Sequence, residues 1–256
     1  MDKAAFYKSL RRRESGVFGT RLSQSQVNGI EGILTAFEQV GDGRSSTLAY
    51  ALATAYHEVG GRMVPVREGF ASTDAGARRA VEALARKRGP NSNVAKYAKP
   101  QQPYGHVYYG RGHVQLTWLD NYRDSSTDAG VDLVKTPDAM LDPAISARVM
   151  IKGLLDGRWN GRGHGLRYYL DKGDLEGARR TVNITDKWAV IAGYYRAFLA
   201  AIEAGGGVSA KRPDPVPPIM PAPADTDAPF TEQTSPQRPW WVALQTLFSA
   251  IFGGNK

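Results

Sequence analysis

The stretch that decides the fold is Thr54-Ala55-Tyr56-His57-Glu58-Val59-Gly60-Gly61. Apolar residues before and within it recur at the spacing i, i+3, i+4, i+7, which predicts the buried face of a helix. These residues are Leu48, Ala51, Leu52 and Ala55. Gly60-Gly61 ends the helix, because glycine readily adopts the left-handed conformation found at helix C-termini. We therefore expect a buried helix from about Ser45 whose last turn carries Glu58.

Two glutamates in unlike surroundings are the first candidates for chemistry. Glu58, on the last turn of a buried helix, should lose part of its hydration, which raises its pKa and keeps a proton available. Glu68 follows in a loop with Pro65, where we expect a solvated and ionised carboxylate. Glycoside hydrolysis needs such a pair, one protonated acid and one charged base. Helix ends and loops also carry glutamates without any catalytic role, so the pair alone leaves both interpretations open.

Composition excludes several classes of protein. The 256 residues contain no cysteine, which excludes a disulfide framework and thiol catalysis and argues against a structural zinc site. His57 precedes Glu58, but no histidine follows four positions later, so the helix does not carry the zinc-protease motif. We expect no metal and no other cofactor.

The chain is basic, with a net charge of +8. A basic surface favours an anionic partner, and nucleic acid, lipid headgroups and bacterial cell wall all qualify. No helix-turn-helix or zinc-finger signature accompanies the charge, so we do not expect a nucleic-acid partner. Neither a secretory signal nor a membrane-spanning run is recognisable in the sequence.

Capping residues followed by apolar faces predict further helices. Residues 1–13 form one, with Phe6 and Leu10 turned inward, and others begin at Ser23, Ser72, Asp142, Asp174 and Asp186. Ser23 and Gln26 form a capping-box pattern, and Trp188 is expected on the inner face of the last helix. The prediction is a mainly α-helical globular domain covering residues 1–208.

Helical periodicity disappears between Asn91 and Tyr122, where Gly, Pro, Tyr and Gln dominate. Aromatic rings and amides on long loops are typical of a sugar-binding groove. A packed loop that happens to be aromatic explains the same composition, and the sequence leaves both readings open.

The C-terminal part has a different composition. Nine of the 15 prolines lie between Pro213 and Pro239, which predicts a linker over residues 209–239. Residues 240–256 form a tail, and Trp240–Phe252 has one wide apolar helical face. Such a helix spans about 20 Å, too short for a bilayer core of about 30 Å. Contact with a membrane surface, docking onto the first domain and self-association all remain open.

Three motifs, in this order and spacing, resemble glycoside hydrolase family 19, which comprises chitinases and bacteriophage endolysins. They are Ala55-Tyr56-His57-Glu58, the pattern Tyr-Tyr-Gly-Arg-Gly-x-x-Gln-Leu-Thr over residues 108–117, and Val182-Asn183. The resemblance covers about residues 20–205. It implies a lysozyme-like, chitinase-like fold with long loops that line a groove.

The resemblance also implies roles for single residues. Glu58 matches the general acid, Glu68 the general base, and Thr117 the hydroxyl that holds the attacking water. The residues that match groove positions are Gln115, Asn121 and Asn183. The family inverts the anomeric carbon, so the two carboxylates should stand roughly 6.5–9.5 Å apart. Asp74 is the nearest alternative base. Asn183-Ile184-Thr185 and His113 depart from the family pattern.

The predicted function is that of an endolysin with muramidase activity, which cleaves the β-1,4 bond between N-acetylmuramic acid and N-acetylglucosamine in peptidoglycan. A chitinase is the alternative, although neutral chitin gives the basic charge no evident use. A non-catalytic wall-binding protein is the second alternative. We expect a monomer. The resemblance further implies that the protein accumulates in the host cytoplasm until a holin releases it to the wall.

Overall fold

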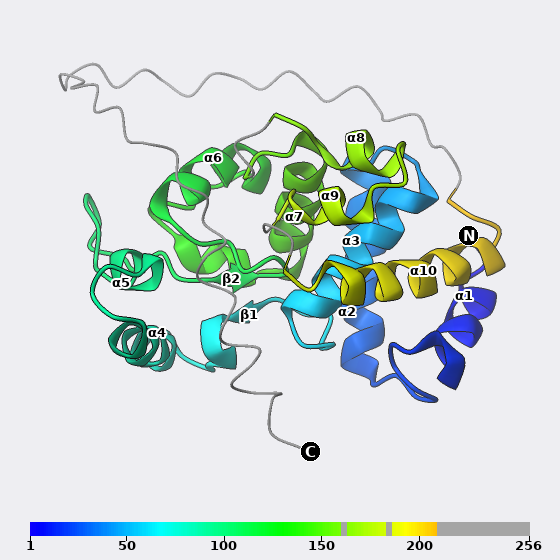
Figure 1. The fold of residues 1–256 in the computed structure, drawn as a ribbon, viewed down its shortest axis with the longest axis horizontal. Coiled ribbons are helices and arrows are strands. Elements are labelled where there is room, and N and C mark those ends of the chain that lie inside the picture. Colours follow the sequence, from blue (N-terminus) through cyan, green and yellow to red (C-terminus); the bar gives the residue numbers. More distant parts are fainter. Residues whose placement is uncertain (160–162, 183–185, 209–256) are drawn as a thin grey trace.

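The computed structural model describes residues 1–159, 163–182 and 186–208. Within them, short and long helices surround one two-stranded sheet (Figure 1). The α-helices are α1 (Lys3–Leu10), α2 (Gln24–Val40), α3 (Ser45–Glu58), α4 (Asp74–Arg88), α5 (Asn93–Tyr97), α6 (Leu119–Ala129), α7 (Pro143–Asp156), α8 (Leu166–Leu170), α9 (Leu175–Arg179) and α10 (Trp188–Ala204). The 3-10 turns are η1 (Arg13–Ser15), η2 (Glu68–Phe70) and η3 (Pro137–Leu141), and the strands are β1 (Val66–Arg67) and β2 (Arg111–Gly112).

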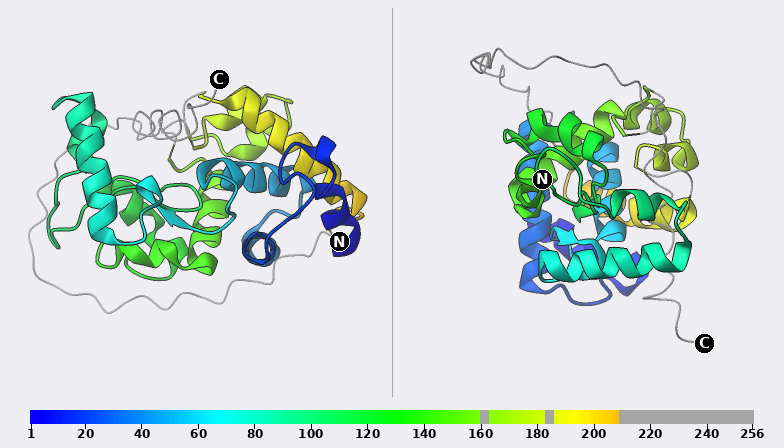
Figure 2. Two further views of the ribbon diagram at one scale, coloured as in Figure 1. Left: turned by 90° about the horizontal axis from the view of Figure 1, so that it is seen from below. Right: turned by 90° about the vertical axis from the view of Figure 1, so that its left-hand side faces the viewer.

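Helix α3 is the centre of the fold, with α10 along it and α2, α7 and α8 also against it (Figure 2). Every residue from 47 to 55 is buried, so the helix is covered on all sides and not only on the predicted face. Alanine at 49, 51, 53 and 55 lets neighbouring helices approach closely. This burial fixes the position of Glu58 at the helix end.

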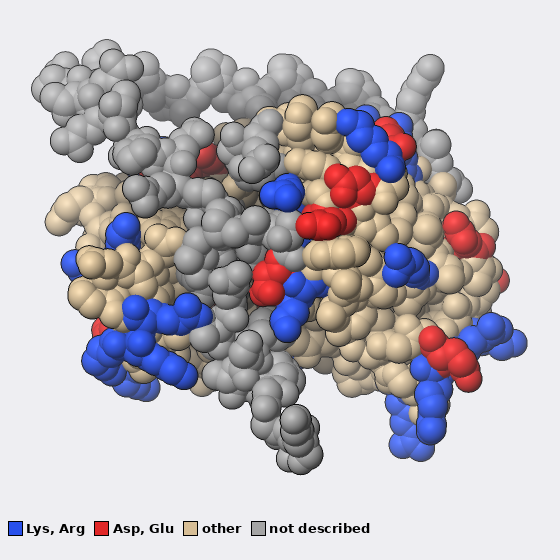
Figure 3. All heavy atoms as spheres, viewed as in Figure 1, with Lys and Arg blue, Asp and Glu red and all other residues tan. Residues whose placement is uncertain are grey.

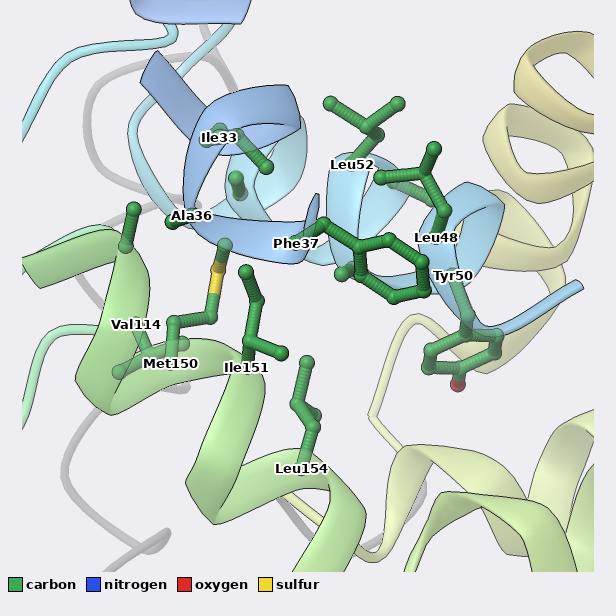
Figure 4. Packing of buried hydrophobic residues seen from close by; sticks show 14 of the residues in the cluster. Ile33, Ala36, Phe37, Leu48, Tyr50, Leu52, Val114, Met150, Ile151 and Leu154 are labelled. Carbon is green, nitrogen blue, oxygen red and sulfur yellow. The ribbon is translucent and has the colours of Figure 1, made fainter. Parts of the chain in front are cut away.

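The main core joins α2, α3 and α7 (Figure 4). The ring of Phe37 from α2 extends toward Leu48 and Tyr50 of α3, and the side chains labelled on α7 point toward α2. The residues drawn from α7 are Met150, Ile151 and Leu154, all 1% exposed or less. Close packing of this kind makes the main core the rigid base of the molecule.

A second, smaller core lies at the other end of the molecule. Here α4 and α5 form an arm, residues 74–99, which packs on the chain just before β2 (Figures 1 and 2). The buried residues of this core are Ala77, Val81, Val94, Tyr97, Val107 and Tyr109. Trp118 packs against both cores, so it joins the arm to the rest of the domain.

The two strands connect distant parts of the sequence. β1 pairs antiparallel with β2, with Val66 opposite Gly112 and Arg67 opposite Arg111. The chain then folds back through a bridge between Arg111 and Leu116. This small sheet ties the segment after Glu58 to the long loop that carries the middle sequence motif.

Most predicted helices and several caps are confirmed. Ser23 and Gln26 form the capping box of α2, and Asp142 caps α7 with proline at the first helical position. Gly60 and Gly61 follow α3 with φ of 58° and 75°, the left-handed conformation expected there.

Three expectations are wrong. Residues 91–122 contain α5 and the start of α6, because a helix of five residues is too short to show a period. Trp188 is 36% exposed, since the first turn of α10 extends beyond the core that begins at Ile191. Lys187 stands at the N-cap of α10, with φ of 60° and no side-chain cap, where Asp186 was expected.

The central aromatic residues of this loop do not line an exposed groove. Tyr108 and Tyr109 are fully buried, whereas Tyr104 is 46% exposed. The linker and the tail lie outside the described residues, so both stay predictions. Within the described part of the chain, no helix is long and apolar enough to cross a membrane.

Candidate active site

Glu58 is the buried end of the central helix. It is 2% exposed, and its Oε1 lies 2.7 Å from Nη1 of Arg179 on α9. Neither atom has an aligned hydrogen-bond partner within the described residues, so charge holds the pair together. Burial raises the pKa of Glu58, and the Arg179 cation opposes this rise. The effect of burial is the larger, because a fully enclosed carboxyl loses its whole hydration shell. The raised pKa of Glu58 agrees with its expected burial, and its role as the acid stays a prediction.

Arg179 is a residue that the sequence analysis missed. Its side chain is 2% exposed, and its Nε donates to the carbonyl oxygen of Asp186 at 3.1 Å. Arg179 follows Leu175 by four positions, so the two side chains share one face of a helix. This spacing is the one sequence signal that could have shown that Arg179 points inward. Arg180 beside it carries the same charge without that placement.

Glu68 corrects a prediction. It was expected to be solvated, yet it is 2% exposed. Its Oε1 accepts a hydrogen bond from the Tyr97 hydroxyl at 2.7 Å, and its Oε2 accepts from the Gly110 N–H at 2.8 Å. The Glu68 N–H in turn donates to the Gly110 carbonyl at 2.7 Å. The pairing of β1 with β2 thus draws this loop residue into the interior.

The charge state of Glu68 reflects opposing effects. Burial raises its pKa, while the bonds from Gly110 and Tyr97 and the cation of Arg111 lower it. A carboxylate oxygen has two lone pairs, so each oxygen of Glu68 can still accept one further hydrogen bond. A general base would use these lone pairs, and that role of Glu68 stays a prediction.

Arg111 is the buried cation near Glu68, and it binds the surrounding acidic and aromatic side chains. It is 2% exposed, its Nε donates to Asp138 at 2.8 Å, and its guanidinium lies 3.6 Å from the centre of the Tyr109 ring. Asp74, the alternative base, lies 3.4 Å from Arg111 and 2.8 Å from Arg78. Asp74 also accepts from the Tyr109 hydroxyl at 2.8 Å, so its carboxylate anchors the arm.

Three other predicted site residues support the loop that follows β2. The Gln115 amide donates to the carbonyls of Val66 and Gly112 at 3.0 and 3.2 Å. The Thr117 hydroxyl donates to the Gln115 carbonyl at 2.8 Å, and the Asn121 amide donates to the Thr117 carbonyl at 2.8 Å. These donors thus bind backbone, while the side-chain oxygens of the three residues and the second N–H of the Asn121 amide take no part in these bonds.

The structure therefore brings the predicted residues into two groups. Glu58 with Arg179 belongs to the main core. Glu68 joins the second group, which is built on the β1–β2 pair with Gln115, Thr117 and Asn121. Asn183 lies outside the described residues, so its role stays a prediction, as does the expected separation of the two carboxylates.

A half-buried histidine, His57, and a buried one, His113, are both held neutral near the site. Burial, with the cations of Arg179 and Lys187, lowers the pKa of His57 to about 3. Burial lowers the pKa of His113 to about 4, and its ring nitrogens lie 2.9 Å from Ser146 Oγ and 3.3 Å from the Met63 carbonyl. The departure from the family pattern at His113 thus serves to join the loop to α7.

A helical domain with one buried, protonatable glutamate and a second glutamate held by hydrogen bonds defines a glycosidase-like site. The chain belongs to glycoside hydrolase family 19: the family model described as chitinase class I matches residues 26–154, just over half of the 256 residues. The matched region contains Glu58, Glu68 and the loop around Thr117. The predicted family is confirmed, while the endolysin branch stays a prediction.

Similar proteins carry chitinase names. The chain is 30% identical over 91 residues to inactive chitinase-like protein 1 of Hevea brasiliensis, which covers 28% of this chain and 29% of that protein. The match thus spans less than a third of that relative. Among solved structures, chitinase C from Streptomyces griseus HUT6037 is 20% identical, with a TM-score of 0.47 over 80% of this chain and 76% of that one. A mutant of chitinase C is 18% identical, with a TM-score of 0.46 and the same coverage.

Proposed function

We propose that the protein is a peptidoglycan-degrading muramidase of the endolysin type, which hydrolyses β-1,4 bonds between N-acetylmuramic acid and N-acetylglucosamine with inversion. The observation that carries the proposal is Glu58, a buried carboxyl with a raised pKa at the position of the general acid. Membership of family 19 supports glycoside hydrolysis as the reaction.

Each step of the proposed reaction has a residue for it. Glu58 gives its proton to the glycosidic oxygen as the bond from that oxygen to the anomeric carbon breaks. A water molecule attacks the anomeric carbon from the opposite face and gives a proton to Glu68. Glu58 ends ionised, and the cation of Arg179 at 2.7 Å stabilises that charge.

Charge supports peptidoglycan as the substrate. The chain has a net charge of +8, and peptidoglycan carries carboxylates whereas chitin is neutral. A long-range attraction to an acidic polymer speeds encounter and holds the enzyme on its substrate.

A chitinase is the second candidate function. The description of the family model, chitinase class I, favours it. One relative is named as inactive, which makes a direct measurement of hydrolysis the first experiment.

That experiment compares wild type and Glu58→Gln on purified, lipid-free peptidoglycan and on colloidal chitin, with reducing ends identified by mass spectrometry. Loss of a positioned general acid should lower the rate by about 10²–10⁴. Glu38→Gln is the matched control, because Glu38 is an exposed glutamate on α2, and it should keep the wild-type rate.

The products decide between the candidates. Fragments ending in N-acetylmuramic acid support the muramidase, and fragments ending in N-acetylglucosamine contradict that bond preference. Cleavage of chitin alone favours the chitinase. Binding to sacculi with no release of fragments by any variant favours the wall-binding protein.

A further inference from the structure

The α4–α5 arm carries a large share of the positive charge of the domain. Residues 74–99 contain seven lysines and arginines but only two acidic residues. The arm therefore has a net charge of +5, more than half of the +8 of the whole chain. Figure 3 shows these cations gathered over α4, at the lower left of the molecule. The basic character is thus gathered in this arm and in the N-terminal segment, where residues 1–22 hold six lysines and arginines and two acidic residues.

The cations of the arm are available to a partner. Six of them are exposed, namely Arg79, Arg86, Lys87, Arg88, Lys96 and Lys99, and none forms an ion pair with another described residue. Of the two acidic residues, Asp74 forms ion pairs with Arg78 and Arg111.

Helix stability explains only part of this charge. Arg86, Lys87 and Arg88 occupy the last turn of α4, where cations interact favourably with the helix dipole. Arg79 lies in the second turn of the same helix, and Lys99 lies beyond α5. Neighbouring cations repel one another, and helix stability does not explain why Arg79 and Lys99 lie in this group. An anionic partner would explain it.

The arm is joined directly to the candidate active site. Tyr97, the last residue of α5, donates the hydrogen bond to Glu68. Its ring centre also lies 5.4 Å from that of Trp118, on the loop that carries Thr117. The small core of the arm holds α4 in a fixed place beside this contact. A polymer that crosses the site at Glu68 has the arm next to it.

We propose that the α4–α5 arm binds the carboxylates of an acidic glycan strand, so that the enzyme selects an anionic polymer over a neutral one. This proposal rests on the proposed function, in which a glycan strand lies across Glu58 and Glu68. The exposed cations act together with several carboxylates of the strand, and each contact is weak and screened by salt.

The test compares two triple variants of the full chain with equal change of charge. The arm variant carries R79Q, R86Q and K87Q. The control variant carries K8Q, R11Q and R12Q, which remove two arginines and one lysine from the equally exposed end of α1. Binding to purified sacculi is measured on ice at low and high salt, and hydrolysis of a neutral N-acetylglucosamine oligomer is measured in parallel.

The arm variant should bind sacculi about tenfold more weakly than the control at low salt, because each exposed pair contributes roughly 1.4- to 5-fold. The difference should vanish at about 1 M salt, where screening acts within about 3 Å. Hydrolysis of the neutral oligomer should be equal in all three proteins. Equal binding by the arm and control variants would overturn the proposal.

Modified ligands identify the chemistry that the arm recognises. Sacculi with amidated carboxylates should bind wild type as weakly as untreated sacculi bind the arm variant. Binding that depends on the arm and survives amidation, or that occurs only with anionic lipid vesicles, would contradict an acidic glycan as the partner. Hydrolysis of sacculi is measured separately. Sacculi that bind through the arm but are not cut would contradict only the proposed muramidase activity. Sacculi that are cut, but whose binding does not depend on the arm, would contradict only the proposed role of the arm.

Discussion

Replacing Tyr97 by phenylalanine should move the pH dependence of the reaction. The Tyr97 hydroxyl donates a 2.7 Å hydrogen bond to Oε1 of Glu68 in a fully buried setting. Such a bond favours the ionised carboxylate, so its loss raises the pKa of Glu68 further above the ordinary value. Hydrogen bonds to charged groups contribute about 1.5–3 kcal/mol, and about 1.4 kcal/mol corresponds to one pKa unit. The expected rise is therefore about 1–2 units.

The pH profile of kcat/KM for peptidoglycan hydrolysis measures this rise. Glu68 must be ionised to accept a proton, so it governs the acidic limb of the profile, whereas Glu58 must be protonated and governs the basic limb. In Tyr97→Phe the acidic limb should move to higher pH by about 1–2 units, while the basic limb stays in place.

Tyr108→Phe is the matched control. The Tyr108 hydroxyl also makes a 2.8 Å hydrogen bond, but it donates to the neutral carbonyl of Val134. That variant should lose about 0.5–1.5 kcal/mol of unfolding free energy without a shift of the acidic limb. If both variants lose stability and neither profile moves, Tyr97 does not control Glu68, and the reasoning from the hydrogen bond is refuted.

The remaining predictions concern the acid, the loop and the tail. Arg179→Lys, which keeps the charge but not the planar guanidinium, should weaken the contact with Glu58 and raise its pKa, so the basic limb should move to higher pH; an unmoved limb would contradict the pairing. Gly110→Ala places a methyl 2.8 Å from Gln115 Oε1 and should lower the unfolding free energy by about 1–3 kcal/mol, measured by thermal denaturation. Gly193→Ala meets nothing within 4 Å inside α10 and should instead raise it by about 0.5–1 kcal/mol. Deleting residues 213–256 should leave sacculus hydrolysis intact but reduce binding to liposomes if Trp240–Phe252 contacts a membrane; unchanged liposome binding would refute that role.

What the sequence could predict depended on long repeating patterns. The apolar spacing around Leu48 gave α3, and the position of Glu58 at its end gave the raised pKa. The solvated state expected for Glu68 was wrong, because two strands of two residues each, from segments far apart in the chain, bury it. Such short strands leave no alternating pattern to recognise.

The partners of the two glutamates escaped prediction for a related reason. Tyr97 and Arg179 each end a helix of five residues, and one turn of helix shows no periodic face. Their direction is set by tertiary contacts, namely the small core of the arm for Tyr97 and the charge of Glu58 for Arg179. The motif over residues 108–117 identified the loop, but it did not reveal that its polar donors bind backbone.

Because the molecule has two cores, the two glutamates are held by parts of the structure that can unfold separately. Glu58 belongs to the main core, while the orientation of Glu68 depends on Tyr97 and hence on the six-residue core of the arm. Small packing units open locally at a lower free energy than the whole domain. Partial opening of the arm would remove the Tyr97 hydrogen bond from Glu68 and leave the bonds to Gly110 in place, so on heating the candidate base would lose part of its support before the main core unfolds.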